Sequence, residues 1–196
     1  MRLFLVRHGQ TPSNVLRALD TGRPGPGLTE LGQEQARALV ERLAEEHLDA
    51  VYASPLLRAQ LTAGPLSQSR NLQATVLEGL EEIGAGVLEM LNDDDSCASY
   101  GAHVIAWGRG DAASRIDGAE DSATFFTRFD AAVEEMARTH GPESTVVAVS
   151  HGAAIRCWTA ARVAHEGAFD VRQPLANTGI VAVEGLPGSW RLHALL

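Results

Sequence analysis

The stretch FLVRHGQTPSN, residues 4–14, contains the pattern on which the rest of the interpretation builds. The apolar run that enters it begins at residue 2, and residues 2–6 are too few for a helix but suit a buried β-strand. Thr11 followed by Pro12 is typical of a helix start, with threonine as N-cap and proline at the first helical position. The predicted strand therefore ends by bringing Arg7 and His8 to the turn that precedes a helix.

Two other short apolar runs end in the same way. Residues 49–53 (DAVYA) predict a strand, and Ser54-Pro55 then predicts the capped start of a helix that carries Arg58 in its first turn. Residues 145–149 (TVVAV) predict a further strand, which is followed by Ser150-His151-Gly152 and another helix. Three strand ends in this chain thus deliver basic or imidazole side chains to the start of a helix.

The remaining segments complete an alternating order of strands and helices. Thr29 predicts the start of a helix that extends to about Glu46, and a second amphipathic helix contains Phe125, Phe129, Ala132, Val133 and Met136. Further strands are predicted over 72–77 and, as a terminal hairpin, over 180–184 and 190–195. This order predicts an α/β fold with a mostly parallel sheet covered on both faces. Ligands bind at the carboxyl ends of such strands, so we expect the three polar strand ends to share one site.

The length of 196 residues is enough for one domain with a full core. We expect residues 1–196 to form this single domain, with an inserted, substrate-facing segment at about 84–117. That region is acidic and rich in glycine, and its weak periodicity predicts a loop or a small helical subdomain. Asp93-Asp94-Asp95 lacks the glycine and distal glutamate of an EF-hand, so we interpret it as a solvated loop rather than a cation site.

The amino-acid composition and net charge limit the kinds of molecule that the protein is expected to bind. Hydrophobic residues make up 45% and charged residues 21%, which is ordinary for a soluble globular protein. The net charge of −9 argues against nucleic acid or an anionic membrane as a partner, so a phosphate site would have to be a local basic pocket. Cys97 and Cys157 lack metal-ligand spacing and predict free thiols. No signal-peptide pattern and no apolar run near 18 residues is present, so a cytoplasmic location is expected.

The polar residues at the strand ends suit phosphoryl chemistry. The N-terminus of a helix offers unpaired N–H groups to a phosphate, and Arg7 and Arg58 would add bidentate hydrogen bonds. One of the two imidazoles, His8 or His151, could attack phosphorus, while the other, if protonated, would stabilise the oxygens in the transition state. A carboxylic acid is also needed to protonate the leaving oxygen and later to activate water.

Six segments, taken in chain order, resemble those of the histidine phosphatase superfamily, which includes the cofactor-dependent phosphoglycerate mutases. Together they extend over nearly the whole chain. They are LVRHGQTPSN (5–14), LTELGQEQA (28–36), ASPLLRAQLTA (53–63), LEEIGAG (80–86), GAED (118–121) and VVAVSHGAAI (146–155).

The resemblance implies a role for each matching residue. His8 would be the nucleophile that becomes phosphohistidine, Glu82 would be the proton donor, and Arg7, Arg58 and His151 would bind the phosphoryl oxygens. The substrate-binding positions that it implies are Thr11, Asn14, Thr21, Gly22 and Gly152. It also implies a three-layer α/β/α sandwich that needs no metal and no organic cofactor for hydrolysis.

The sequence departs from the family pattern at several positions. Gln10 stands where many of the mutases carry glutamate, and Met90 stands where a glycine usually closes the acidic segment. The GAED stretch lacks the serine that usually follows the glutamate. None of these changes removes a catalytic group, but the Met90 change and the unusual insert leave the choice of substrate open.

Three functions are compatible with these residues. We expect a phosphatase that hydrolyses the phosphomonoester of a small phosphorylated metabolite. A phosphoglycerate mutase is the alternative, but it must shield phosphohistidine from water, and the hairpin predicted to end near Leu196 leaves the insert as the candidate lid. A non-catalytic phospho-ligand binder is the third, and the complete set of catalytic residue types argues against it. The sequence does not determine the oligomeric state.

Overall fold

The computed structural model describes all 196 residues and contains one six-stranded sheet with the strand order β3-β2-β4-β1-β5-β6. Strands β1 to β4 run parallel, and β5 and β6 form an antiparallel pair that is added beside β1. The prediction of a mostly parallel sheet with a terminal hairpin is therefore confirmed. The strands are β1 (Arg2–Arg7), β2 (Ala50–Ala53), β3 (Ala74–Val76), β4 (Thr145–Ser150), β5 (Ile180–Glu184) and β6 (Arg191–Leu195).

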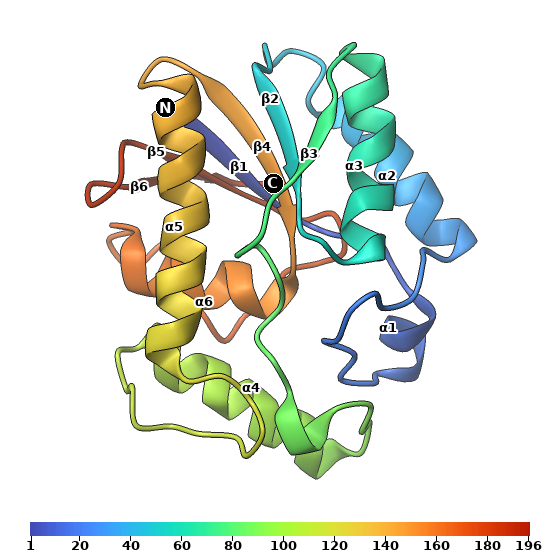
Figure 1. Ribbon diagram of the computed structural model, residues 1–196, viewed down its shortest axis with the longest axis vertical. Coiled ribbons are helices and arrows are strands. Elements are labelled where there is room, and N and C mark those ends of the chain that lie inside the picture. Colours follow the sequence, from blue (N-terminus) through green and yellow to red (C-terminus); the bar gives the residue numbers. More distant parts are fainter.

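Helices cover both faces of this sheet (Figure 1). Helices α2 and α3 pack against each other on one face, and α5 and α6 lie on the other, while α4 packs against α6 beyond the ends of the strands. The helices are α1 (Pro12–Leu16), α2 (Glu30–Arg42), α3 (Leu57–Ser69), α4 (Asp94–Gly108), α5 (Ser122–His140) and α6 (Gly152–Arg162), with a 3-10 turn, η1 (Gly86–Leu88).

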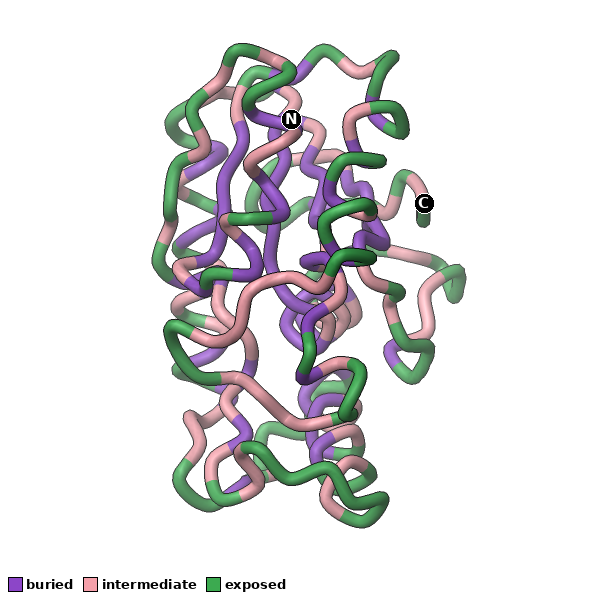
Figure 2. The backbone as a smooth tube through the Cα atoms, turned by 90° about the vertical axis from the view of Figure 1, so that its right-hand side faces the viewer, coloured by how far each residue is buried: buried purple, intermediate pink, exposed green.

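Strand β1 shows why the molecule has two cores. Successive side chains of a strand point to opposite faces of the sheet. Leu3 and Leu5 pack with residues of α5 and α6, whereas Phe4 and Val6 pack with residues of α2 and α3. Because both sets are buried, the strand is apolar along its length, and this accounts for the apolar run in the sequence. Figure 2 shows the buried residues concentrated in this interior and the exposed ones in the outer loops.

The predicted helix starts are confirmed at two positions. Thr11 and Thr29 are N-caps whose hydroxyl groups accept the backbone N–H groups of Asn14 and Gly32. The prediction at Ser54-Pro55 is wrong, since α3 begins only at Leu57 and has no side-chain cap. The Ser54 hydroxyl lies instead 2.8 Å from Nε2 of His151, and this buried contact replaces the expected cap.

The acidic stretch after residue 83 is helical, one of the two alternatives expected for it, but its aspartate triplet differs from the prediction. Asp93 is the N-cap of the 15-residue helix α4, and Asp94 and Asp95 occupy its first turn, where carboxylates suit the helix dipole. Tyr100, Val104 and Trp107 are buried and belong to the same core cluster as α5 and α6. The triplet is therefore the start of a helix and not a solvated loop.

The structure also shows the state of the two cysteines and the character of the helices. Cys157 is buried and Cys97 is partly exposed, and both are free thiols as predicted. None of the helices combines the length and the apolar character that a membrane span requires.

Candidate active site

The carboxyl ends of β1 and β4 bring the two predicted imidazoles together. In the parallel pairing of these strands Arg7 lies opposite Ser150, so the next residues, His8 and His151, leave the sheet side by side. The backbone N–H of His8 donates to the carbonyl of Ser150 at 3.0 Å, and the two ring centroids are 5.2 Å apart. Both rings are buried. The parallel register thus turns two distant motifs into one site.

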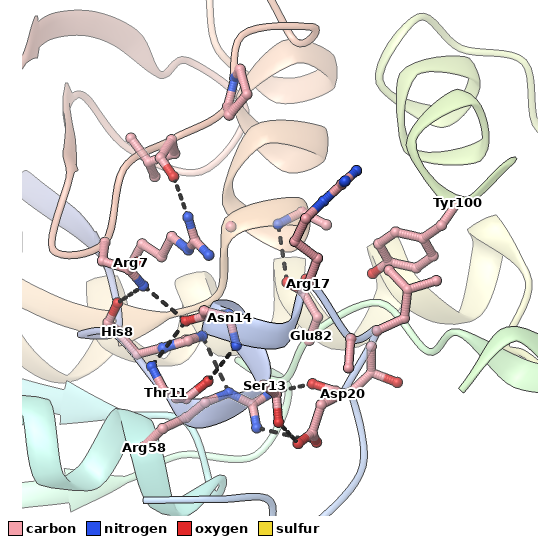
Figure 3. A pocket seen from close by; sticks show the side chains of 18 of the residues that line it. Arg7, His8, Thr11, Ser13, Asn14, Arg17, Asp20, Arg58, Glu82 and Tyr100 are labelled. Carbon is pink, nitrogen blue, oxygen red and sulfur yellow. Dashed lines mark hydrogen bonds and ion pairs between the residues drawn. The ribbon is translucent and has the colours of Figure 1, made fainter. Parts of the chain in front are cut away.

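The hydrogen bonds of His8 select its reactive nitrogen, and the side chains of His8 and Arg58 are drawn in Figure 3. Its Nδ1 lies 2.7 Å from the carbonyl oxygen of Gly9, which can only accept, so Nδ1 carries the proton. Nε2 therefore has the lone pair, and Nε of Arg58 donates to it at 3.2 Å. Burial, with further contributions from the cations Arg58 and Arg7, lowers the pKa of His8 to about 3. The ring is accordingly a neutral imidazole with Nε2 directed at the basic groups of the site.

Gly9 is required by the close approach of this turn to α2. A Cβ atom at Gly9 would lie 2.6 Å from the carbonyl oxygen of Gly32, and one at Gly32 would overlap the carbonyl oxygen of Gln10. The two glycines therefore allow the turn that carries His8 to lie directly on the N-terminal end of the helix.

Two arginines flank His8, and each has a buried donor without a partner. Arg58 is 2% exposed and donates from Nη2 to the carbonyl of Asp20 at 3.0 Å, while its Nη1 makes no hydrogen bond and lies 3.8 Å from the Asp20 carboxylate. Arg7 donates from Nη1 to the carbonyl of Leu175 at 2.6 Å, while its Nε is unpartnered. Gly152 allows Arg7 to pack against the start of α6, because a Cβ there would lie 3.1 Å from Nε of Arg7.

His151 supplies a third unpartnered group. Its Nε2 lies 2.8 Å from the Ser54 hydroxyl, and its buried Nδ1 has no hydrogen-bond partner. The Ser54 hydroxyl already accepts the N–H of Leu56 at 3.4 Å, so its own proton can be donated to Nε2, which makes Nδ1 the N–H of the ring. Burial, with nearby His8 and Arg58, lowers the pKa of His151 well below its ordinary value. The ring is therefore neutral in the free protein.

These three orphaned donors are costly for a folded protein unless a ligand accepts their hydrogen bonds. An unsatisfied buried donor costs about 1–3 kcal/mol, and more when it is charged. Arg7 Nε, Arg58 Nη1 and His151 Nδ1 belong to three residues that neighbour His8 in the sequence or in space. Unsatisfied donors of this kind suit the oxygens of a small oxyanion.

Glu82 is one of the two carboxylates that line this cavity, the other being Asp20. Its side chain accepts the backbone N–H groups of Ala153 at 3.1 Å and Ala154 at 2.7 Å, at the N-terminus of α6. The two alternative acids in the segment lie elsewhere: Glu81 accepts from the N–H of Gly79 at 2.6 Å, and Glu89 binds Thr21. Glu82 is thus fixed on the same helix end that His151 precedes.

The predicted substrate-binding residues are mostly, but not all, at the cavity. Thr11, Asn14, Thr21 and Gly152 line it. Gly22 does not, and its backbone N–H donates to the Glu89 carboxylate at 3.1 Å. Of the five predicted catalytic residues, four line the cavity: Arg7, His8, Arg58 and Glu82. His151 does not line it and is fully buried beside His8. Four of the five predicted substrate-binding residues line the cavity.

Several residues at the cavity were not found by sequence reasoning. Arg156 was detectable in principle, because it lies four residues after Gly152 on α6 and so faces the same side of the helix. Asn177 donates to the carbonyl of His8 and to Oδ1 of Asn14, both at 3.1 Å, from a loop that has no periodic pattern. The residues missed in this way are Ser13, Arg17, Ala18, Leu19, Asp20, Tyr100, Ala153, Arg156, Pro174, Leu175 and Asn177.

The depressed pKa of His8 makes a prediction about stability. Above pH 6.5, the ordinary pKa of an imidazole, the ring of His8 is neutral in both the folded and the unfolded chain. Between pH 6.5 and about 3 the ring takes up a proton only in the unfolded chain. The free energy of unfolding should therefore decrease as the pH falls through this window, with a contribution from His8 of up to about 1.4 kcal/mol per pH unit. In urea titrations His8→Ala should show a shallower acid slope than wild type. Equal slopes would contradict the pKa of His8.

The fold and the cavity together define a class of protein. This α/β sandwich has a pair of imidazoles at its strand ends, and one of them, His8, lines a cavity of about 430 Å³ together with the arginines Arg7 and Arg58 and the carboxylate of Glu82. These are the groups required for phosphoryl transfer to or from a small molecule. Residues 3–196 match the model of the Histidine phosphatase superfamily (branch 1). The chain belongs to this superfamily, and its fold is that of histidine-phosphatase-type phosphoric monoester hydrolases.

Several relatives are similar over most of the chain. PE-PGRS family protein PE_PGRS11 of Mycobacterium tuberculosis is 35% identical over 95% of the chain, which spans about a third (35%) of that protein's length. Phosphoserine phosphatase 1 of Hydrogenobacter thermophilus is 31% identical over a region that covers 80% of this chain and 73% of the length of that protein. Among solved structures, a mycobacterial glucosyl-3-phosphoglycerate phosphatase is 27% identical, with a TM-score of 0.80 and coverage of 98% and 97% of the two chains.

Proposed function

We propose that this protein hydrolyses the phosphomonoester of a small phosphorylated metabolite through a phosphohistidine intermediate on His8. The observation that carries the proposal is that Nε2 of His8, with Arg58 Nε 3.2 Å away, is accompanied by three buried donors without a hydrogen bond on the residues Arg7, Arg58 and His151. Their number matches the oxygens of one transferred phosphoryl group. No metal or organic cofactor is part of the proposal.

The first half-reaction follows from these positions. The phosphoryl oxygens would accept hydrogen bonds from Arg7 Nε, Arg58 Nη1 and His151 Nδ1, and Arg58 Nε would move from Nε2 of His8 to an oxygen. The freed lone pair forms the nitrogen–phosphorus bond while the bond from phosphorus to the ester oxygen breaks. Glu82 gives its proton to that oxygen, so an alcohol leaves.

The second half-reaction returns the site to its starting state. The Glu82 carboxylate takes a proton from water, and the water oxygen attacks phosphorus as the bond to Nε2 of His8 breaks. Inorganic phosphate then leaves, and both His8 and Glu82 regain their initial protonation states. The same carboxyl group thus serves first as acid and then as base, which requires it to stay within reach of both leaving alcohol and water.

The charge of the cavity supports a small anionic metabolite as the substrate. The lining includes four arginines, Arg7, Arg17, Arg58 and Arg156, against two carboxylates, although the whole chain has a net charge of −9. Arg156 donates to the carbonyls of Gly152 and Val171 and has no carboxylate partner. This local excess of positive charge favours a substrate with an acidic group besides its phosphate, as in the phosphoserine and phosphoglycerate compounds named for its relatives.

The test is a panel of phosphorylated metabolites in the presence of a chelator. The purified protein should release inorganic phosphate from p-nitrophenyl phosphate and, with a higher kcat/KM, from phosphomonoesters that also carry a carboxylate. Interconversion of 2- and 3-phosphoglycerate without net phosphate release would instead favour the mutase. Binding of these compounds by folded protein without any turnover would contradict both enzymes.

A further inference from the structure

The segment that carries Glu82 has no secondary structure of its own. Residues 77–85 lie between β3 and η1; Leu77 still donates to the carbonyl of Ala53 on β2, but residues 78–84 take part in no hydrogen bond of a helix or strand. Figure 1 shows this connection as part of the long green coil that leads from β3 toward α4. A proton donor must nevertheless be held to within a fraction of an ångström of its productive position, since a misplacement of about 1 Å can cost 10²-fold in rate.

Arg128, on α5, supplies hydrogen bonds that the segment lacks. Its Nη1 donates to the carbonyl of Gly79 at 2.9 Å and to that of Glu81 at 3.0 Å, and its Nη2 donates to the carbonyl of Glu82 at 3.0 Å. Glu120 holds the other edge of the guanidinium, accepting from Nε at 2.8 Å and from Nη2 at 2.5 Å. Every nitrogen of this guanidinium is therefore engaged within the protein.

The carbonyls of Leu80 and Ile83, in the same stretch, accept hydrogen bonds from other side chains. The Ser150 hydroxyl, at the end of β4, donates to the carbonyl of Leu80 at 2.7 Å. The hydroxyl of Tyr100, on α4, donates to the carbonyl of Ile83 at 2.7 Å. Five consecutive carbonyls, 79–83, thus accept hydrogen bonds from side chains of three different elements, and Arg128 alone accounts for three of them.

Arg128 does not take part in binding at the cavity. It is absent from the cavity lining, its side chain is 22% exposed on α5, and its guanidinium lies 5.1 Å from the centre of the Phe125 ring. Because its donors are used by backbone carbonyls and by Glu120, none remains for a phosphoryl oxygen. Any influence on the reaction must pass through the segment that it holds.

We propose that Arg128, oriented by Glu120, is a positioning residue that fixes the proton donor Glu82 through its backbone carbonyl and those of Gly79 and Glu81 before it. This inference rests on the role proposed for Glu82. It predicts a specific defect: loss of Arg128 should impair transfer of the proton to the leaving group more than it impairs binding of the phosphoryl group.

Substrates with different leaving groups distinguish a defect in proton transfer to the leaving group from a defect in binding of the phosphoryl group. The p-nitrophenolate ion departs without a proton because its ring delocalises the charge, whereas an aliphatic alkoxide must be protonated as it leaves. In Arg128→Gln, kcat/KM for an aliphatic phosphomonoester should fall roughly 10- to 100-fold, while kcat/KM for p-nitrophenyl phosphate should change by less than about threefold. Glu120→Gln should show the same pattern with a smaller amplitude.

Two reference variants accompany this measurement. Arg138→Gln, on the same helix, removes an exposed arginine that pairs only with Glu135, and it should leave both substrates unaffected. Glu82→Gln should show the same substrate dependence as Arg128→Gln but a larger loss. If Arg128→Gln is unfolded at the assay temperature by thermal melting, Arg128→Lys, which keeps the charge but not the fork of donors, is measured instead by the same criterion.

An equal loss with both substrates in the Arg128 variant would overturn the inference, because it would show a general disturbance of the site. No loss with either substrate would overturn it as well. If Glu82→Gln itself shows no dependence on the leaving group, the proposed role of Glu82 fails. If Glu82→Gln shows the dependence and Arg128→Gln does not, only the role of Arg128 fails.

Discussion

His8→Ala is expected to lower kcat/KM for phosphomonoester hydrolysis by at least about 10³-fold while the protein stays folded. Nε2 of His8 carries the lone pair, and Arg58 Nε already lies 3.2 Å from it, at the place where a phosphoryl group would be held. No second nucleophile can replace it, because Nε2 of His151 is bound to the Ser54 hydroxyl. The steady-state release of inorganic phosphate measures the effect.

A matched histidine provides the control for this variant. The side chain of His47 is 90% exposed at the far end of the sheet from the cavity, so His47→Ala should retain the wild-type rate. Circular dichroism and thermal melting should show that His8→Ala remains folded. Turnover of His8→Ala at the wild-type rate would remove His8 from the mechanism.

Arg58→Met should give the second large effect, a fall in kcat/KM of about 10²- to 10³-fold. Methionine keeps much of the buried volume of the arginine but provides neither the Nη1 donor for a phosphoryl oxygen nor the Nε donor beside His8. Because negative charge grows on these oxygens as phosphorus is transferred, both kcat and the affinity for inorganic phosphate should fall. Initial rates and product inhibition by inorganic phosphate measure the two quantities.

The control for this variant is an arginine outside the site. Arg37 is exposed on α2, and Arg37→Met should leave both quantities unchanged. A kcat/KM of Arg58→Met within a few-fold of wild type, with unchanged inhibition by phosphate, would show that the orphaned Nη1 does not bind the phosphoryl group.

The sequence predicted the convergence of the site because that convergence depends on topology. Short apolar runs separated by helices imply parallel strands, and the ends of parallel strands meet at one edge of the sheet. Arg7, His8 and His151 could therefore be assigned to one place from their position after a strand. Arg58 and Glu82 could be assigned to the site only through the family resemblance, because arginines at helix starts and glutamates in acidic loops are too common to be specific.

The parts that the sequence did not predict depend on contacts between segments far apart in the chain. Ser54 was interpreted as a helix cap because its local sequence fits one, yet the side chain binds His151, 97 residues away. Asn177 has no local pattern, and its role comes from hydrogen bonds to His8 and Asn14. The acidic triplet that begins α4 was interpreted as a loop because the sequence of this helix has weak periodicity.

The most direct test of the central claim is to identify the residue that carries the phosphoryl group during turnover. The protein is mixed with an excess of substrate, quenched in base to preserve phosphohistidine, digested and examined by mass spectrometry. The mechanism predicts the mass of one phosphoryl group on the peptide that contains His8, located on that residue by fragmentation and absent from His8→Ala. A phosphoryl group on a different residue, or none on an enzyme that is turning over, would contradict it.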